Sequence, residues 1–313
     1  MREFELLGRL IAENSRLPAD VTLPPGDDMA AIALPGGVEL LVAADSAIEG
    51  RHTPRGCDPY LIGRKAVLRN LSDVAAMGNA RPLATLACVT LPEGLDESRA
   101  WRLFAGLRET AERWGAPLVG GDTASYGAAG RDLPIVASVT ILALRRDPSG
   151  PIATRAMARP GDGVFVTGRI GGAWDRGTGL GRHLDFAPRL DAAHALCDAI
   201  GDRLGAMIDV SDGLGRDLGH IATASGAAIA LDLARVPTPP EISPIDAIAH
   251  GEDYELAFTA RGEVPADLAG IAVTRIGTVV EGAPAVIVRD GARSFDAIRM
   301  GFEHDGRSGG AAP

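Results

Sequence analysis

Apolar positions recur along the first half of the chain with two spacings, which predict alternating helices and strands. Apolar residues three and four positions apart predict helices over residues 4–12, 60–76 and 98–114. Short apolar runs rich in β-branched residues predict strands over residues 39–44, 83–91, 118–120 and 135–144. The segment between the first helix and the first strand contains Gly26-Asp27-Asp28 and is predicted to be an acidic loop. The first half therefore has the pattern of an α/β unit.

The same alternation returns in the second half after a break. Residues 145–151 combine charged residues with Pro and Gly, as expected for a linker between domains. Beyond the linker, helices are predicted over residues 192–200 and 214–224, and strands over residues 163–166, 206–210, 228–233, 255–259, 273–276 and 285–288. The sequence thus predicts an α/β (α+β) fold with two domains, residues 1–147 and 148–304, and a disordered tail at residues 305–313.

Composition and charge narrow the class of protein. At 313 residues the chain exceeds the size at which one hydrophobic core usually stops growing, and its hydrophobic content of 46% suits a globular protein. The net charge of −10 argues against a nucleic-acid-binding surface, which needs clustered Lys and Arg. Residues 1–7 carry charges among their apolar residues, unlike a signal peptide, and the longest nearly apolar stretch, residues 133–144, is too short to span a bilayer. We predict a cytoplasmic protein with no nucleic-acid or membrane partner.

The reactive side chains exclude several types of site. The three cysteines form no C-x-x-C pair and the six histidines show no H-E-x-x-H spacing, so a zinc site is not predicted. Lys65 is the only lysine among 31 basic residues, and its surroundings do not match the G-x-x-x-x-G-K-[ST] loop of P-loop proteins. The protein-kinase motif set does not occur either. Any phosphate chemistry would therefore depend on arginine and on metal ions held by carboxylates.

Aspartates follow several apolar runs that are predicted to be strands. Asp45 and Asp122 each end such a run, and the run at residues 206–210 leads into Ser211-Asp212-Gly213-Leu214. Functional groups concentrate at strand ends in α/β folds. Taken singly, each aspartate is equally well explained as a helix cap or a turn residue. Taken together, they predict one acidic pocket that holds several Mg²⁺ ions and a polyphosphate, to which Asp73 and one or both of Asp27 and Asp28 contribute.

Three local patterns leave alternatives open. Gly120-Gly121 can bring backbone N–H groups close to a phosphate or can form a plain turn. Asp73 lies on a predicted helix face near the core, where either a metal ion or Lys65 could be its partner. Ser211 or Asp212 could cap the helix that follows and leave its N-terminus open to an anion.

A set of ordered motifs extends over nearly the whole chain. They are G-D-D at 26–28, E-G-x-H at 49–52, K-A-x-x-x-N-L-S-D-x-A-A-M-G at 65–78, G-G-D-T at 120–123, P-G-D at 160–162, S-D-G-L at 211–214 and G-E-D-Y-E-L at 251–256. In this order they resemble the motifs of the thiamine-monophosphate kinase family, in the superfamily of aminoimidazole ribonucleotide synthetase. The resemblance implies a homodimer of two-domain subunits, whose amino-terminal sheets pair into a barrel across the dimer interface. ATP and several Mg²⁺ ions would bind between the domains.

The resemblance also implies roles for individual residues. Metal-binding positions are matched by Asp28, Asp45, Asp73, Asp122, Asp209 and Asp212. Nucleotide-binding positions are matched by Gly121, Asp122, Arg155 and Ser211, and substrate positions by His52, Glu252 and Phe302. The residues expected to carry catalysis are Asp45, Asp122, Asp209 and Arg155. The implied reaction is direct in-line transfer of the γ-phosphoryl group of ATP to thiamine monophosphate, whose phosphate has a second pKa of about 6 and needs no general base.

The sequence departs from the family pattern just before Asp45. Ala43 and Ala44 stand where the family usually has hydroxyl residues, so a metal ligand could be missing. Two alternatives therefore remain open. One is a sister enzyme of the same fold that acts on another phosphorylated or acyl intermediate, and the other is a non-catalytic dimer that binds Mg-nucleotide. Neither alternative predicts ADP release that depends on thiamine monophosphate.

Overall fold

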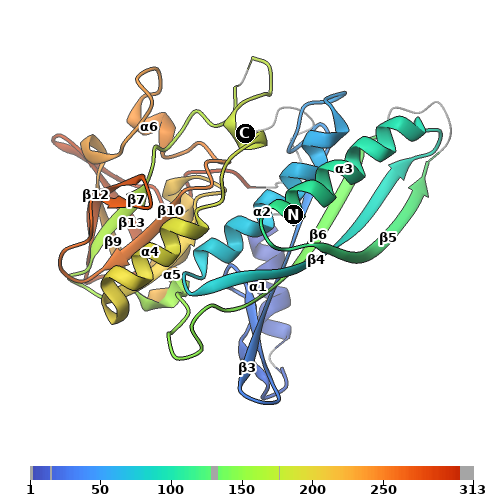
Figure 1. Ribbon diagram of the computed structural model, residues 1–313. Helices are drawn as coiled ribbons and strands as arrows, with labels where there is room; N and C mark the ends of the chain where they lie inside the picture. Colours follow the sequence, from blue (N-terminus) through green and yellow to red (C-terminus); the bar gives the residue numbers. More distant parts are fainter. Residues whose placement is uncertain (1–2, 15, 128–132, 176, 304–313) are drawn as a thin grey trace.

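The protein consists of two β-sheets with helices between and outside them (Figure 1). The computed structural model describes residues 3–14, 16–127, 133–175 and 177–303. The predicted tail at residues 305–313 lies outside the described residues. Helices and strands alternate along the chain in both halves, which confirms the predicted α/β fold class.

The first sheet has six strands in the order β1-β2-β3-β6-β4-β5. Long central strands pair antiparallel, with Asp45 opposite Val139, and β5 pairs in parallel with β4 at one edge. In chain order the strands and helices of this half are α1 (Glu3–Glu13), β1 (Val21–Leu23), β2 (Ala30–Leu34), β3 (Val38–Ile48), α2 (Pro59–Ala76), β4 (Ala80–Pro92), α3 (Glu97–Arg113), β5 (Leu118–Tyr126) and β6 (Val136–Arg145). The three predicted helices are therefore confirmed.

The second sheet has the order β14-β13-β9-β12-β7-β10-β8, with β11 paired to β12. Its central pairs are antiparallel, while β13 and β9 run parallel. The strands are β7 (Gly163–Thr167), β8 (Leu204–Asp209), β9 (Ala228–Asp232), β10 (Leu256–Ala260), β11 (Asp267–Leu268), β12 (Ile271–Val280), β13 (Ala285–Asp290) and β14 (Arg293–Asp296). The helices are α4 (Leu190–Ile200), α5 (Leu214–Ser225) and α6 (Pro244–Ala247), with short 3₁₀ turns η1 (Arg155–Met157), η2 (Arg182–Leu184), η3 (Gly201–Arg203) and η4 (Leu233–Arg235).

Helix α2 lies between the two sheets and contacts strands of both. It packs on β3, β4 and β6 of the first sheet and on β8 of the second. It also crosses α3 at backbone contact, because a Cβ atom at Gly106 would lie only 2.1 Å from the carbonyl oxygen of Tyr60. A helix buried on most of its circumference cannot have a single apolar stripe, and α2 carries the polar residues Lys65, Asn70 and Ser72 into the interior. This position brings its side chains to the functional site.

One hydrophobic core extends across both halves of the chain. It joins α2 and α3 to α4 and to residues of the second sheet such as Phe165 and Phe258, whose rings stack at 5.3 Å. A second core lies on the other face of the second sheet, beneath α5. Burial of large apolar side chains on both faces of this sheet explains the apolar runs at β7, β8 and β10.

The structure corrects several predicted strand boundaries. The segment predicted to be an acidic loop contains β1 and β2, two short strands that continue the first sheet. Strands β3 and β5 run past Asp45 and Asp122, which therefore lie within strands and not at their ends. Of the three predicted strand-end sites, only the one at Ser211-Asp212 follows the end of its strand, because β8 ends at Asp209.

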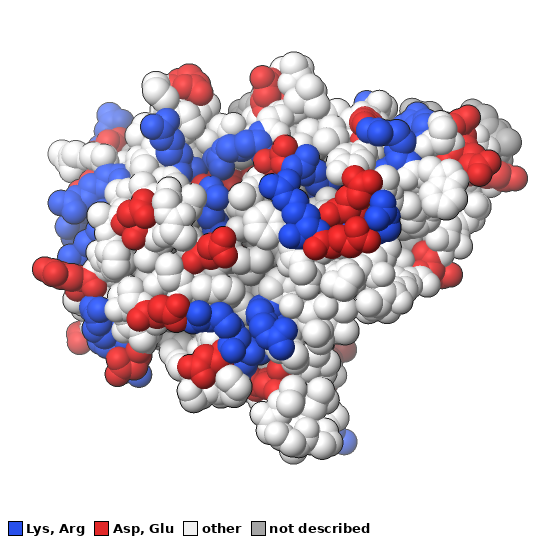
Figure 2. All heavy atoms as spheres, in the orientation of Figure 1, with Lys and Arg blue, Asp and Glu red and all other residues white. Residues whose placement is uncertain are grey.

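The surface carries both signs of charge. On the face drawn in Figure 2, Lys and Arg side chains alternate with Asp and Glu side chains over both halves of the molecule. Within the described ranges, none of the helices is long and apolar enough to cross a membrane.

Candidate functional site

Three aspartates from distant segments meet beside α2. Asp28 precedes β2, Asp73 lies on α2, and Asp209 ends β8 of the second sheet. Each offers a carboxylate oxygen, and these oxygens all lie within 4.8 Å of one another. We call this group the acidic cluster. The structure thus brings together three of the predicted metal-binding residues.

Burial and mutual repulsion disfavour the charged forms of the acidic cluster. Burial, followed by the charge of Asp28, raises the pKa of Asp209 to about 7, although Ser72 donates a hydrogen bond of 2.6 Å to its Oδ2. Burial and the neighbouring carboxylates of Asp45, Asp209 and Asp28 raise the pKa of Asp73 well above its ordinary value. Carboxylates are held this close together where a cation compensates their charge.

Arg155 partly compensates this charge from η1. Its Nη2 donates to Oδ1 of Asp28 at 2.5 Å, and its backbone N–H donates to Oδ2 of Asp27 at 3.0 Å. The pKa of Asp28 is nevertheless raised by burial, and that of Asp27 is raised to about 6 by burial and by Asp28. Oδ2 of Asp28 is buried and has no hydrogen-bond partner among the described residues. This orphaned oxygen and the close carboxylates fit a divalent cation with oxygen ligands.

Asp45 lies beside the acidic cluster on β3. Arg69 of α2 donates from Nε to Asp45 Oδ2 at 2.9 Å and from Nη1 to the carbonyl oxygen of Ser46 at 2.8 Å. The Asp45 side chain keeps 33% of its surface exposed, and its charge contributes to the raised pKa values of Asp73 and Asp209. Arg69 was not predicted as a site residue, because its partner on β3 is evident only once α2 packs on that strand.

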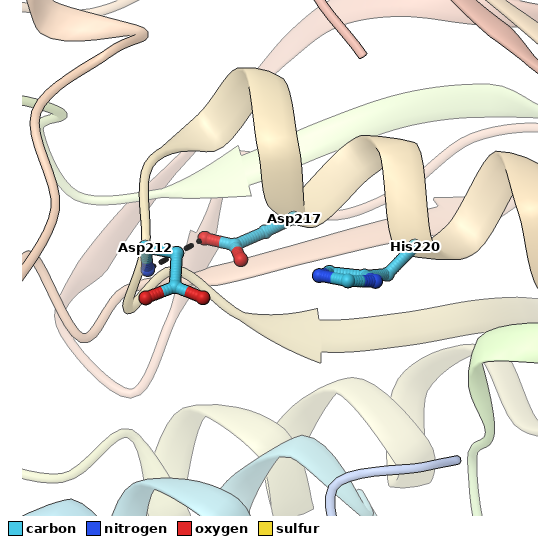
Figure 3. Close-up of side chains that lie close together, drawn as sticks. All are labelled: Asp212, Asp217 and His220. Atoms are coloured by element: carbon cyan, nitrogen blue, oxygen red, sulfur yellow. Dashed lines mark hydrogen bonds between the residues drawn. The ribbon is translucent and has the colours of Figure 1, made fainter. Parts of the chain in front are cut away.

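Asp212 belongs to a second acidic group, formed with Asp217 and His220 of α5 (Figure 3). Oδ2 of Asp217 accepts the backbone N–H groups of Ser211, Asp212 and Gly213 at 3.0 to 3.2 Å. The predicted capping of this helix by Ser211 or Asp212 is therefore wrong. The N-cap is Gly213, with φ at +123°, and the turn is closed from within the helix by Asp217, which the sequence analysis missed.

The three predicted substrate residues line one small pocket next to these groups. His52 comes from the loop after β3, Glu252 from the segment before β10, and Phe302 from the end of the described chain. The pocket is also lined by Arg51, Arg69, Ser211, Asp212 and Tyr254. The guanidinium carbon of Arg51 lies 4.5 Å from the centre of the Phe302 ring. Of the two acidic groups, the second borders the pocket through Asp212.

Two predicted site residues lie elsewhere in the molecule. Gly121 and Asp122 are exposed on β5, the edge strand of the first sheet (Figure 1). Asp122 is in neither of the carboxylate groups described above. Gly121 has φ at +151°, and a Cβ atom there would lie 1.9 Å from the carbonyl oxygen of Ala87, so the parallel pairing with β4 requires glycine.

Lys65, which the sequence left open as a partner of Asp73, pairs with Glu252 through its ammonium group instead.

Similarity to known proteins agrees with this geometry. The family model "AIR synthase related protein, N-terminal domain" matches residues 26–144. Thiamine-monophosphate kinase of Escherichia coli (strain K12) is 34% identical over an alignment that covers 92% of this chain and 94% of the relative. The chain belongs to the thiamine-monophosphate kinase family. A family member from Rhodopirellula baltica is 32% identical, with 96% and 97% of the two chains covered.

Solved structures of the family have the same fold. A structure described as "AaThiL complexed with AMPPCP and TMP" has a TM-score of 0.75 and 26% identity, and covers 94% of this chain and 96% of that chain. Thiamine-monophosphate kinase of Stenotrophomonas maltophilia K279a has a TM-score of 0.67 and 30% identity, with 94% and 99% covered. The hydrogenase maturation protein HypE in complex with ATP, at 22% identity and a TM-score of 0.67, shares the fold with the family.

Proposed function

We propose that the protein transfers the γ-phosphoryl group of ATP to the phosphate of thiamine monophosphate, yielding thiamine diphosphate and ADP. Its family membership over nearly the full length is the observation that carries this proposal. The structural relative bound to AMPPCP, an analogue of ATP, and to TMP supports the same pair of substrates. The acidic cluster, the second acidic group and the pocket are the features that such a reaction needs.

We propose that Mg²⁺ ions bind at the acidic cluster. The unpartnered Oδ2 of Asp28 and the adjacent oxygens of Asp73 and Asp209 would be ligands, with Asp45 and Asp212 at the margins. Bound Mg²⁺ would supply positive charge that offsets the repulsion between donor and acceptor phosphates. The number of ions and the exact ligand set stay predictions, as does the effect of Ala43 and Ala44.

The side chains of this protein would position the reactants without a proton-transfer residue. The acceptor phosphate is largely a dianion at neutral pH, since its second pKa is about 6, and it can attack without a general base. Arg155, fixed by Asp27 and Asp28, would place its guanidinium group against the phosphates. Ser211 and Asp212 line the pocket, where Ser211 would contact the nucleotide and Asp212 would hold a metal ion beside the acceptor phosphate. We propose direct transfer, with no phosphorylated protein intermediate.

The exposed edge of the first sheet supports a homodimer. Every residue from Val119 to Ser125 on β5 is exposed, and Val119 keeps 63% of its surface accessible. A strand with no cover on either face is a suitable surface for a second copy of the chain. Gly121 and Asp122 would then lie at the subunit interface and could complete the nucleotide site. The barrel across the dimer, the domain boundary at residues 147 and 148 and the cytoplasmic location stay predictions.

The decisive experiment is ADP release measured with Mg²⁺, ATP and thiamine monophosphate. We expect turnover with thiamine monophosphate and none with thiamine, which lacks the acceptor phosphate. Asp45→Asn should keep the fold and lower turnover, with half-saturation at higher Mg²⁺ concentration, while the exposed Asp290→Asn serves as the matched control. Nucleotide binding without turnover would favour the non-catalytic alternative, and a labelled phosphoprotein would exclude direct transfer.

A further inference from the structure

Lys65, the only lysine of the chain, is completely buried on α2. Its ammonium group donates to the carbonyl oxygen of His52 at 2.6 Å, to Nδ1 of His183 at 2.7 Å and to Oε2 of Glu252. An ammonium group has three N–H donors, so each donor has its own acceptor. These acceptors come from three separate segments, and two of them belong to residues that line the candidate substrate pocket.

The surroundings make Glu252 the anionic partner of Lys65. Because the ammonium can only donate, Nδ1 of His183 must accept, and the ring proton lies on Nε2, 3.1 Å from the carbonyl oxygen of Gly179. Burial and the charge of Lys65 lower the pKa of His183 to about 4, so the ring is neutral at pH 7. Trp174 stacks on this ring at 4.2 Å, and its own ring centre lies 5.3 Å from the Lys65 nitrogen.

Glu252 is held in one orientation by its Oε2 atom. This oxygen accepts from Lys65 and, at 3.0 Å, from the hydroxyl group of Tyr254. Burial alone would raise the pKa of Glu252, but the charges of Lys65 and Arg69 outweigh it and lower the pKa to about 2. Glu252 is therefore a carboxylate at neutral pH, and the side-chain bonds that it forms with described residues go to one oxygen, Oε2.

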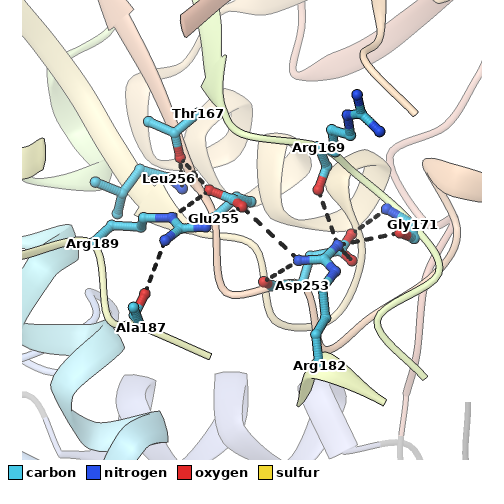
Figure 4. A network of polar contacts seen from close by, with 9 residues as sticks. All are labelled: Thr167, Arg169, Gly171, Arg182, Ala187, Arg189, Asp253, Glu255 and Leu256. Atoms are coloured by element: carbon cyan, nitrogen blue, oxygen red, sulfur yellow. Dashed lines mark hydrogen bonds and ion pairs between the residues drawn. The ribbon is translucent and has the colours of Figure 1, made fainter. Parts of the chain in front are cut away.

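The backbone around Glu252 is strained, and two acidic residues that follow it, Asp253 and Glu255, are held by the network drawn in Figure 4. Glu252 and Tyr254 have φ at +70° and +53°, which side-chain-bearing residues rarely adopt. Asp253 accepts from Arg182 at 2.7 Å, and Glu255 accepts from Arg189 at 2.6 and 2.7 Å. The carboxylates of Asp253 and Glu255 are thus engaged in ion pairs within the protein. Of these three acidic residues, Glu252 is the one that lines the pocket.

We propose that Lys65 is a positioning residue for the thiamine-phosphate pocket. Lys65 holds the Glu252 side chain by its Oε2 atom, so that Oε1 faces the substrate. This inference rests on the proposed function and adds to it a residue and a recognition chemistry. A carboxylate oxygen fixed in the same pocket as Phe302 suits a substrate with a cationic aromatic ring and an amino donor, because charge, stacking and a hydrogen bond act together. Lys65 also binds the His52 carbonyl, so it sets the distance between the two pocket residues.

Lys65→Met tests this role because it removes the charge and keeps most of the volume. We expect KM for thiamine monophosphate to rise at least ~10-fold, as for loss of a hydrogen bond to a charged group, while KM for ATP changes less than ~2-fold. Arg64→Met is the matched control. Arg64 is the residue before Lys65. Its guanidinium group pairs with Asp185, two residues after His183, and not with Glu252. Equal changes in both KM values would overturn the proposal.

Two further variants keep the test informative if Lys65→Met folds poorly. Tyr254→Phe removes only the second donor to Oε2 and should raise KM for thiamine monophosphate by ~3-fold or more, again without effect on ATP. In a Glu252→Gln background, Lys65→Met should raise KM less than it does in the wild-type background, since Lys65 acts mainly through Glu252 and otherwise only on the His52 carbonyl. A full additional loss in that background would contradict the proposal.

The test also separates this inference from the proposed function. A wild-type protein that does not convert thiamine monophosphate would refute the function. A crystal structure of Lys65→Met in which Glu252 and His52 keep their places would refute the positioning role whatever the activity. A rotated Glu252 carboxylate together with weakened calorimetric binding of thiamine monophosphate is the expected result.

Discussion

Replacing Asp209 by Asn should stabilise the metal-free protein and at the same time remove its activity. Asp209 is buried, and its pKa is raised from 3.8 to about 7. Ionisation at high pH is therefore less favourable in the folded protein than in the unfolded chain. At about 1.4 kcal/mol per pKa unit, this difference costs the folded state roughly 4 kcal/mol above pH 7. Asn has the same shape without the charge, and its oxygen can still accept from Ser72.

The sign and the pH window follow from the two pKa values. Below pH 4 the carboxyl group is protonated in both states, so the substitution gives no electrostatic gain. Between pH 4 and 7 the unfolded chain is ionised first, and the advantage of Asp209→Asn grows by about 1.4 kcal/mol per pH unit. Above pH 7 it is constant. Because Asp28 and Asp73 share the same repulsion, 4 kcal/mol is an upper limit for this site alone.

Urea unfolding with EDTA at pH 5, 6, 7 and 8 measures this difference directly. The variant should unfold at higher urea concentration than wild type, with a gap that widens up to pH 7. Addition of Mg²⁺ with AMPPCP should stabilise wild type and have little effect on the variant. The reasoning fails if Asp209→Asn is less stable than wild type at pH 8, or if the gap does not depend on pH.

Other substitutions test the remaining features. Arg189→Gln should lower the free energy of unfolding by about 3 kcal/mol or more, because it leaves Glu255 buried without its bidentate partner, whereas Arg235→Gln in an exposed pair should change it by less than about 1 kcal/mol. Equal effects in chemical denaturation would show that burial of the pair is unimportant. Val119→Lys on the exposed edge strand should convert the proposed dimer to monomer in light scattering, and an unchanged dimer mass would remove β5 from the interface.

Periodicity in the sequence was sufficient to predict the principal helices and most strands. Helices such as α3 bury one apolar face, and the strands of the second sheet are buried on both faces, so both patterns are clear. Strands β1 and β2 were missed because they are short and lie beside Gly and Pro residues. The boundaries at Asp45 and Asp122 were wrong because a polar residue within a strand looks like its end when the partner strands are unknown.

The candidate site could be predicted as a set of residues but not as an arrangement. Acidic residues after apolar runs suggested the cluster, yet nothing local distinguishes Asp73 and Asp209, which meet at α2, from Asp122 on a distant edge strand. The partners of Lys65 and the amide contacts of Asp217 depend on which loops come together in the folded chain. These contacts depend on tertiary packing, which cannot be predicted from the local patterns of a single sequence.

The location of α2 between the sheets limits how this protein can be divided. The helix belongs to the first half of the sequence, but its buried side chains share one core with α4 and the second sheet. A fragment ending at residue 147 would expose that surface to water and would lose the partner of Ser72. The two halves are therefore expected to unfold in one cooperative transition. An engineered version should tolerate relocated chain ends or exchanged loops better than separation of the two halves.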